Sequence, residues 1–207
     1  ICRKYDIMLC ADDVICGYGR TGEWFGAQYF GFTPDIMTTA KGLTSGYIPM
    51  GAVLFNERVA SVLRQQGGEL AHGYTYSGHP VCAAVALENI RILQDEKIVE
   101  TCKHDTGPYL AERWKALGEH PLVGEVRIAG MVGALELVPN KVERKFFADR
   151  GKVGGLCRNI ALNNGLILRA TYDSMLLSPP LVISCSEIDE LFEKTWKSLN
   201  ETAKALA

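Results

Sequence analysis

The sequence lacks a marked excess of charge of either sign. Its 207 residues include 22 Lys and Arg against 24 Asp and Glu, which leaves a formal net charge of −2. Proteins that bind nucleic acids usually carry a basic surface, so no nucleic-acid partner is expected. No apolar run has the length needed to cross a bilayer. Residues 1–6 carry charges where a secretory signal peptide needs an apolar stretch. We therefore expect a cytoplasmic protein with no membrane partner.

Paired cysteines are also missing. The seven cysteines are an odd number, scattered along the chain without a C-x-x-C pair: Cys2, Cys10, Cys16, Cys82, Cys102, Cys157 and Cys185. This spacing argues against a disulfide framework and against a zinc site, and favours a reducing compartment. Cys10 and Cys82 lie in apolar runs, so we predict that both are small core residues.

The composition is that of a globular protein, with 47% hydrophobic and 22% charged residues. The charges of residues 95–97 and the Gly-Pro pair at residues 107–108 mark a change of pattern. We predict an α/β region over residues 1–100 and an α+β region over residues 101–207. The chain does not begin with Met, and its first residues resemble a helix end leading into a strand. We therefore expect a segment of a longer protein.

In the first region, short apolar runs predict strands over residues 6–11, 35–39 and 51–55. Helices are predicted over residues 56–63 and 80–94. The first strand ends in two aspartates, Asp12 and Asp13. α/β proteins place ligand-binding groups at such strand ends, although an aspartate there can equally cap a helix or order a loop.

In the second region, the pattern predicts a helix over residues 109–117 and a glycine-turned hairpin over residues 123–137. A further helix is predicted over residues 144–163, followed by strands over 166–170 and 175–181. Ser184 is predicted to open the last helix.

Lys41 stands between a predicted strand and a segment rich in glycine and hydroxyl residues. Such a place suits an amine that is fixed and partly desolvated, which makes it nucleophilic. Pyridoxal phosphate enzymes need such a lysine, a carboxylate for the ring nitrogen, donors for the phosphate and an arginine for the substrate carboxylate. The chain offers Lys41, Asp12, Thr75 and Arg169 for these four roles. A lysine in such a place is more often structural than catalytic. The hypothesis of a pyridoxal phosphate site therefore rests on the four residues together and not on Lys41 alone.

Longer motifs carry a family resemblance. ADDVICGYGRTG at residues 11–22, PDI at 34–36 and TAKGL at 39–43 resemble the signature of class III pyridoxal-phosphate aminotransferases. SGYIPMGA at residues 45–52 and HGYTYSGHP at 72–80 are most similar to ω-amino acid–pyruvate transaminases. The resemblance implies the aspartate-aminotransferase-like fold of pyridoxal-phosphate-dependent transferases and covers only the C-terminal half of the family. Residues 1–100 would end the large cofactor-binding domain, and residues 101–207 would form the small domain.

The resemblance also assigns roles around the cofactor, pyridoxal 5′-phosphate. Lys41 matches the Schiff-base lysine, Asp12 the carboxylate that pairs with the pyridine nitrogen, and Val14 the side chain packed on one face of the ring. The family usually has Asp-Glu where this chain has Asp12-Asp13. The second carboxylate of that pair tends to support the loop rather than the ring.

Three further residues complete the implied site. Thr75, with the backbone of Tyr74, matches the phosphate contact that a neighbouring subunit of a homodimer supplies. Arg169 matches the mobile arginine that binds substrate carboxylates. We expect His72 and His79, which flank the phosphate contact, to be structural, and we favour a structural role for Arg20 as well.

The implied activity is transfer of an amino group from an amine or ω-amino acid to a keto acid such as pyruvate, in two half-reactions. Two alternatives stay open. The same constellation serves aminomutases and decarboxylating relatives. This chain could also be a non-catalytic piece that binds no cofactor, with apolar surface exposed.

Overall fold

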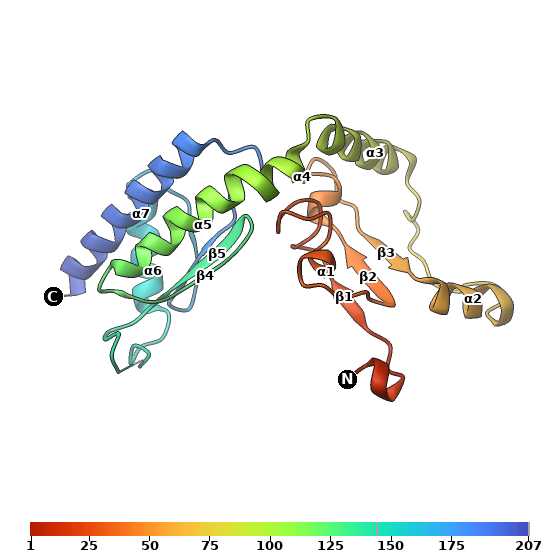
Figure 1. Cartoon of the computed structure of the whole chain (residues 1–207), viewed down its shortest axis with the longest axis horizontal. Helices are drawn as coiled ribbons and strands as arrows, with labels where there is room; N and C mark the ends of the chain where they lie inside the picture. Colours follow the sequence, from red (N-terminus) through yellow and green to blue (C-terminus); the bar gives the residue numbers. More distant parts are fainter. Residues whose placement is uncertain (144, 207) are drawn as a thin grey trace. The chain divides into compact units, whose positions relative to one another are not determined.

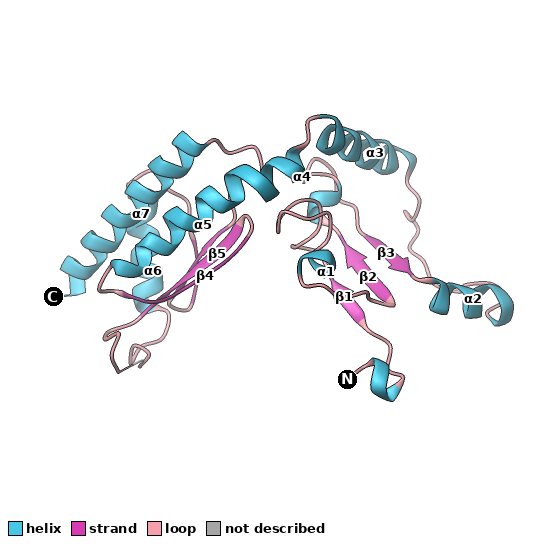
Figure 2. Ribbon diagram, viewed as in Figure 1, coloured by secondary structure: helices cyan, strands magenta, loops and turns pink. Residues whose placement is uncertain are grey.

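The computed structural model describes residues 1–143 and 145–206 (Figure 1). The chain divides into two compact units, Ile1–Glu100 and Thr101–Ala207, each with its own sheet and helices (Figure 2). No helix in the described part of the chain combines the length and the apolar character that crossing a membrane requires.

The first unit is built on a three-stranded sheet with the order β1-β2-β3. Strand β1 (Cys10–Asp12) runs parallel to β2 (Ile36–Thr39), and β3 (Ala52–Phe55) runs antiparallel to β2. The three predicted strands are confirmed, although the first begins later than expected.

Four helices belong to this part of the chain, together with short 3-10 turns η1 (Arg3–Tyr5) and η2 (Lys41–Leu43). The helices are α1 (Gly26–Tyr29), α2 (Glu57–Gln66), α3 (Pro80–Asp95) and α4 (Ile98–Thr101), the last of which contains the boundary between the units. Asn56 caps α2, since its side chain accepts a hydrogen bond from the Val59 amide at 3.3 Å. Pro80 begins α3, where its missing N–H leaves no gap in the helix.

The core of the first unit lies between α3 and the loops that follow β1 and β2. Tyr18, Leu43, Ala86 and Leu93 form it, and Trp24 packs against them. The prediction for Cys10 is wrong, because Cys10 is exposed. In the alternating pattern of β1, Ala11 takes the buried face and Cys10 the open one.

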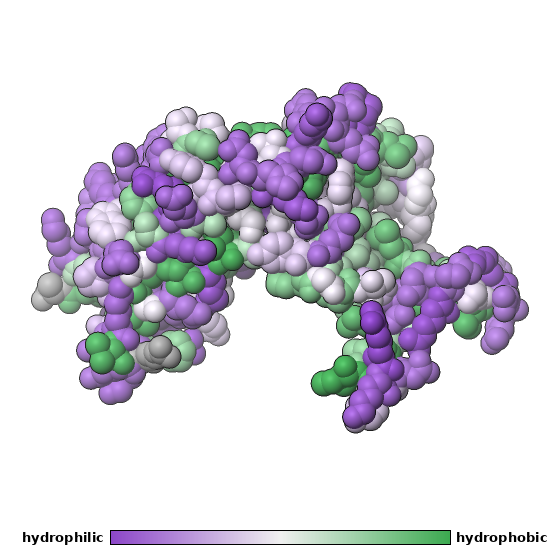
Figure 3. Space-filling view, in the orientation of Figure 1, coloured by the Kyte–Doolittle hydropathy of each residue, from purple (hydrophilic) through white to green (hydrophobic). Residues whose placement is uncertain are grey.

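Large apolar side chains remain exposed over the strands of this unit, as expected. Val53 is 54% exposed, Leu54 43% and Phe55 43%, so β3 is open on both faces. Apolar residues are visible at the surface in Figure 3.

The second unit carries a four-stranded antiparallel sheet with the order β4-β5-β7-β6. Its strands are β4 (Val123–Ala129), β5 (Val132–Leu137), β6 (Arg169–Thr171) and β7 (Ser174–Leu177); its helices are α5 (Gly107–Ala116), α6 (Lys152–Asn163) and α7 (Cys185–Leu206). The predicted hairpin is confirmed, with Gly130 at φ 56° in its turn. Trp114 is almost fully buried in the core.

Helix α6 begins at Lys152, so residues 145–151 of the predicted helix are not helical, and residue 144 lies outside the described residues. A buried carboxylate sets this start. Asp173, in the turn between β6 and β7, accepts hydrogen bonds from the Gly151 and Gly154 amides, each at 2.9 Å. These are free amides of the first helical turn, so the long-range cap decides where the helix starts.

The Gly-Pro pair that marked the change of pattern lies inside a continuous helical stretch. A π-helical segment, η3 (Cys102–Thr106), leads directly into α5. The Gly107 amide bonds to the Cys102 carbonyl, and a Cβ at Gly107 would lie 2.1 Å from that oxygen. Pro108 has no N–H, so it donates no backbone hydrogen bond to the preceding turn. In a regular α-helix its ring would also clash with a carbonyl of that turn, and the wider π-turn gives the ring more space.

His120 is a buried ionisable side chain of the second unit, with 2% exposure. Its Nδ1 accepts the Leu122 amide at 3.1 Å, its Nε2 lies 3.2 Å from the Asn200 Oδ1, and its ring meets Trp196 edge to face. The ring is therefore neutral with its proton on Nε2. Burial lowers the pKa of His120, the charge of Lys141 lowers it further, and the Asn200 contact opposes this shift.

This depressed pKa predicts a loss of stability in acid. Below pH 6.5, the ordinary value for histidine, the unfolded chain binds a proton that the folded chain binds less readily. We expect the free energy of unfolding to fall by about 1 kcal/mol more between pH 7.5 and 5.5 in the wild type than in His120→Gln. Urea unfolding of both proteins at the two pH values measures the difference. An identical pH dependence would contradict the prediction.

Candidate active site

The predicted site residues of the first unit gather at one edge of its sheet. Because β1 and β2 are parallel, their carboxyl ends meet there, with Asp12 opposite Thr38 in the register. The Asp12 Oδ1 accepts hydrogen bonds from the Thr38 hydroxyl at 3.4 Å and the Val14 amide at 3.2 Å. These contacts orient an otherwise exposed carboxylate, and they place half-buried Val14 beside it.

Lys41 begins the η2 turn two residues after β2 ends, at the same edge of the sheet. Its backbone φ is +42°, in the left-handed region that residues with a Cβ seldom occupy. Leu43 and Thr44 are the buried residues of this segment, and the Lys41 side chain is exposed. The expected partial desolvation of Lys41 is therefore not found in this chain.

Asp13 supports the loop that follows β1, in keeping with the role that the resemblance implied for the second carboxylate. It is 3% exposed, and its two oxygens accept the Gly26 amide at 3.0 Å and the Ala27 amide at 3.4 Å. The carboxylate thus caps α1 and closes the loop between that helix and β1.

Removal of this cap should destabilise the first unit. In Asp13→Ala two buried amides lose their partner, so we expect the free energy of unfolding to fall by about 2 kcal/mol. Chemical denaturation measures the change. Asp149→Ala, at an exposed position, is the control and should stay within about 0.5 kcal/mol of the wild type. Equal effects of the two substitutions would contradict the assigned role.

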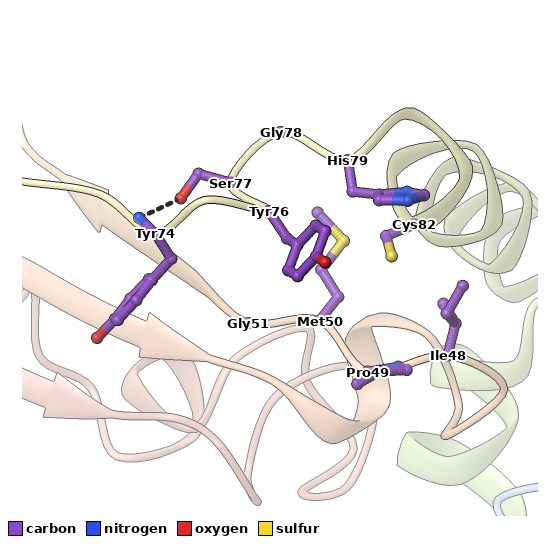
Figure 4. Close-up of a pocket in the computed structure, with 10 residues that line it drawn as sticks. All are labelled: Ile48, Pro49, Met50, Gly51, Tyr74, Tyr76, Ser77, Gly78, His79 and Cys82. Carbon is purple, nitrogen blue, oxygen red and sulfur yellow. Dashed lines mark hydrogen bonds between the residues drawn. The ribbon is translucent and has the colours of Figure 1, made fainter.

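Tyr74 and Thr75 lie in the segment between α2 and α3, where residues 71–80 are all exposed. The Tyr74 amide, a predicted phosphate donor, donates to the Ser77 Oγ at 2.9 Å. In Figure 4 the Tyr76 ring points over Met50, whereas the Tyr74 ring points away from His79 and Cys82. These residues line a cavity of about 500 Å³.

A second cavity, of about 460 Å³, joins this segment to the sheet edge. Its lining residues are Thr38, Thr39, Gly51, Ala52, Val53, His72, Gly73, Tyr74 and Ser77. Tyr74 and Thr38, the residue that bonds to Asp12, therefore line the same cavity. Thr75 is not among its lining residues.

Arg169 belongs to the second unit, where it is the first residue of β6 and is exposed. Gly165, a few residues before it, has a φ of +73° and closes the end of α6. In the described part of the chain no group of three or more His, Cys, Asp or Glu side chains could hold a metal ion.

Two residues near Lys41 were missed in the sequence. Buried Tyr18 donates from its hydroxyl to the Thr39 Oγ1 at 3.3 Å. Asn89, on α3, bonds to the backbone that follows Lys41. Both act across more than twenty positions of sequence, and the only local signal is an asparagine inside an alanine-rich helix, where that residue is disfavoured.

Comparison of the chain with known proteins identifies its family. The family model of class III aminotransferases matches residues 1–199. The putrescine–pyruvate aminotransferase of Pseudomonas aeruginosa is 61% identical over 206 residues, which are 100% of this chain and 45% of that protein. The diaminobutyrate–2-oxoglutarate transaminase of Halomonas elongata is 42% identical over 212 residues, which cover 100% of this chain and 45% of that protein.

Solved structures agree. The ω-transaminase from Pseudomonas jessenii in complex with PMP matches with a TM-score of 0.93 and 41% identity, over 98% of this chain and 45% of that one. A transaminase from the marine bacterium Virgibacillus matches with a TM-score of 0.94 and 38% identity, over 100% of this chain and 48% of that one. The fold is thus that of the pyridoxal-phosphate-dependent transferases, as expected. The chain spans about half the length of the curated relatives it matches, and it belongs to the class III aminotransferases.

Proposed function

We propose that the intact protein transfers an amino group from an amine or ω-amino acid to a keto acid such as pyruvate, with pyridoxal 5′-phosphate as cofactor. One observation carries the proposal: an amine, Lys41, and a carboxylate, Asp12, lie at the ends of adjacent parallel strands in a class III aminotransferase chain. The name of the relative at 61% identity favours a diamine such as putrescine as donor and pyruvate as acceptor.

The residues at the sheet edge fit this cofactor. The Asp12 carboxylate is oriented by two hydrogen bonds. Its partner Thr38 also lines a cavity of about 460 Å³, which lies within the range of about 300–1,000 Å³ that small-molecule sites occupy. Asp12 would face the ring nitrogen, where its negative charge favours the protonated nitrogen. Val14 would pack on the ring, and the Lys41 amine would hold the cofactor.

When bound, pyridoxal phosphate supplies an electron sink for the substrate carbon that loses its proton. Lys41 would supply the base that moves this proton from the substrate carbon to the C4′ carbon of the cofactor in the first half-reaction, and from C4′ to the keto-acid carbon in the second. Arg169 would bind the carboxylate of the keto acid through its planar pair of donors. Thr75 and the Tyr74 backbone would contact the phosphate group of the pyridoxal phosphate that is bound to the second subunit of the dimer.

The assembly and location that we infer rest on two features of the chain. Residues 71–80 are exposed throughout, which supports a homodimer in which this segment completes the partner's site. The seven cysteines, all of them in the described part of the chain, form no disulfide, which supports a cytoplasmic location. We further assign Ile1–Glu100 to the later part of the cofactor-binding large domain and Thr101–Ala207 to the small domain.

Alanine formation tests the proposed activity. The intact protein, loaded with pyridoxal phosphate, should convert pyruvate to alanine when putrescine is present. Carbon dioxide release from an amino acid without alanine formation would identify a decarboxylating enzyme instead. An amino group moved within one molecule, with no need for pyruvate, would identify an aminomutase.

Arg169→Ala should separate the two kinds of substrate. Loss of a charge-assisted pair of hydrogen bonds should raise the KM for pyruvate by about 10- to 100-fold. The half-reaction with a neutral-tailed monoamine such as butylamine should change by less than about 3-fold, because that donor has no carboxylate. Single-turnover spectra of each half-reaction measure both effects. Arg158→Ala, on the exposed face of α6, is the control. Equal losses with both substrates would contradict the role of Arg169.

A further inference from the structure

A single side chain of helix α3 ties down the turn that carries Lys41. The Nδ2 of Asn89 lies 2.8 Å from the carbonyl oxygen of Gly42 and 3.1 Å from that of Leu43. The Oδ1 of the same side chain accepts a hydrogen bond from the Ser45 hydroxyl at 2.6 Å. Both ends of the Asn89 amide are therefore engaged with the segment that directly follows Lys41.

The backbone of this turn needs outside support. Lys41 holds a left-handed φ of +42°, which costs energy in any residue with a Cβ. Inside the turn, the Leu43 amide bonds to the Ala40 carbonyl at 3.0 Å and the Thr44 amide to the Lys41 carbonyl at 3.2 Å. Carbonyls at the end of so short a helix have few partners within it, and Asn89 supplies donors to two of them.

The residue type at position 89 is explained by this contact and not by the helix. Asn89 is half-buried inside α3, among alanines and aliphatic residues that favour a helix. Asparagine is a poor former of helix interiors, because its amide competes for backbone groups. Here that amide bonds to a second backbone segment, so its hydrogen bonds offset the low helix propensity of asparagine at this position.

A second set of contacts confines the same turn. A Cβ at Gly42 would lie 3.0 Å from the Tyr18 Cβ and 3.2 Å from the Gly17 carbonyl oxygen. Tyr18 in turn donates to the Thr39 hydroxyl, just before the turn. The backbone at Gly42 is thus packed closely against the loop after β1 and hydrogen-bonded to α3, which leaves it little room to rotate.

We propose that Asn89 is a positioning residue for Lys41. It holds the η2 turn in the strained conformation from which the Lys41 amine reaches the bound cofactor, and it acts through the backbone of Gly42 and Leu43. This inference rests on the proposed role of Lys41 in holding pyridoxal phosphate.

The rate at which Lys41 captures pyridoxal phosphate tests the inference. Cofactor-free intact protein is mixed with increasing pyridoxal phosphate, samples are reduced with borohydride at set times, and peptide mass mapping gives the modified fraction at Lys41. Asn89→Asp places a carboxylate against two carbonyl oxygens, and Asn89→Ala removes the bonds while favouring the helix. Gln94→Glu, an amide-to-acid change at an exposed position of the same helix, is the control.

We expect both Asn89 variants to lower the saturating rate constant by about 10-fold or more, because small misplacements of a reacting group have large effects on rate. The half-saturating concentration should change by less than about 3-fold, and Gln94→Glu should match the wild type. A residue that only stabilised the fold would lower the final fraction modified and leave the rate constant of the folded molecules unchanged. An unchanged rate constant in both Asn89 variants overturns the inference.

Amide hydrogen exchange keeps the two proposals distinguishable. Without cofactor, the Thr44 and Gly46 amides, which both donate to the Lys41 carbonyl, should exchange about 10-fold faster in Asn89→Ala than in the wild type. Unchanged exchange overturns the role of Asn89 alone. A wild type that takes up no pyridoxal phosphate at Lys41 overturns the proposed function, whatever the exchange rates show.

Discussion

Lys41→Ala should abolish covalent capture of pyridoxal phosphate and lower the rate of amino transfer by about 10⁴-fold or more. The substitution removes both the amine that would hold the cofactor and the base that would move the proton. General base catalysis alone contributes about 10²- to 10⁴-fold. The wild type should be yellow, with an absorbance maximum at about 400–430 nm from the lysine-bound cofactor. Absorbance and alanine formation, measured on the same samples, give the two losses.

Two comparisons sharpen this test. Lys41→Arg retains a positive charge but offers no nucleophile, so it should behave like Lys41→Ala if the amine chemistry is what matters. Lys204→Ala removes an exposed lysine of α7 and should retain full activity. A yellow Lys41→Ala protein with wild-type turnover would show that another amine holds the cofactor.

Asp12→Asn should separate binding of the cofactor from its use. The amide has nearly the shape of the carboxylate and retains an oxygen that can accept from the Val14 amide and the Thr38 hydroxyl. It lacks the negative charge that would favour a protonated ring nitrogen. We expect capture at Lys41 to persist, while amino transfer falls by about 10²- to 10⁴-fold.

The measurement is the single-turnover rate of alanine formation, together with the fraction of Lys41 modified after borohydride reduction. Asp12→Glu restores the charge at a displaced position and should recover part of the rate. Asp105→Asn, at an exposed position of the second unit, is the control. Transfer at the wild-type rate in Asp12→Asn would remove Asp12 from the site.

Much of the fold could be predicted because its signals are local. The short apolar runs that became β1, β2 and β3, the Asn56 cap of α2 and the glycine turn of the β4–β5 hairpin all depend on neighbouring residues. Two features were not predicted, one for a long-range reason and one for a local reason. The start of α6 depends on Asp173, about twenty positions away. The helical path through Gly107 depends on a π-turn that a Gly-Pro pair does not announce.

The placement of two candidate site residues was readable from their positions at strand ends: Asp12 after one apolar run and Lys41 after the next. Spacing and motif were enough to predict that they share one edge of the sheet, because parallel strands bring their carboxyl ends to one edge whatever packs around them. The solvent exposure of individual side chains could not be predicted from the sequence. Lys41 is exposed and Cys10 faces the open side of its strand, since burial depends on which elements cover each face.

The tertiary structure alone decided how the Lys41 turn is held. Asn89 and Gly42 stand 47 positions apart, and no sequence period links a side chain on α3 to a carbonyl in a 3-10 turn. Residue types, strand ends and family motifs are properties of short segments, and the sequence determined them. The hydrogen bonds around Lys41 join segments that meet only after folding, so three-dimensional packing had to supply them.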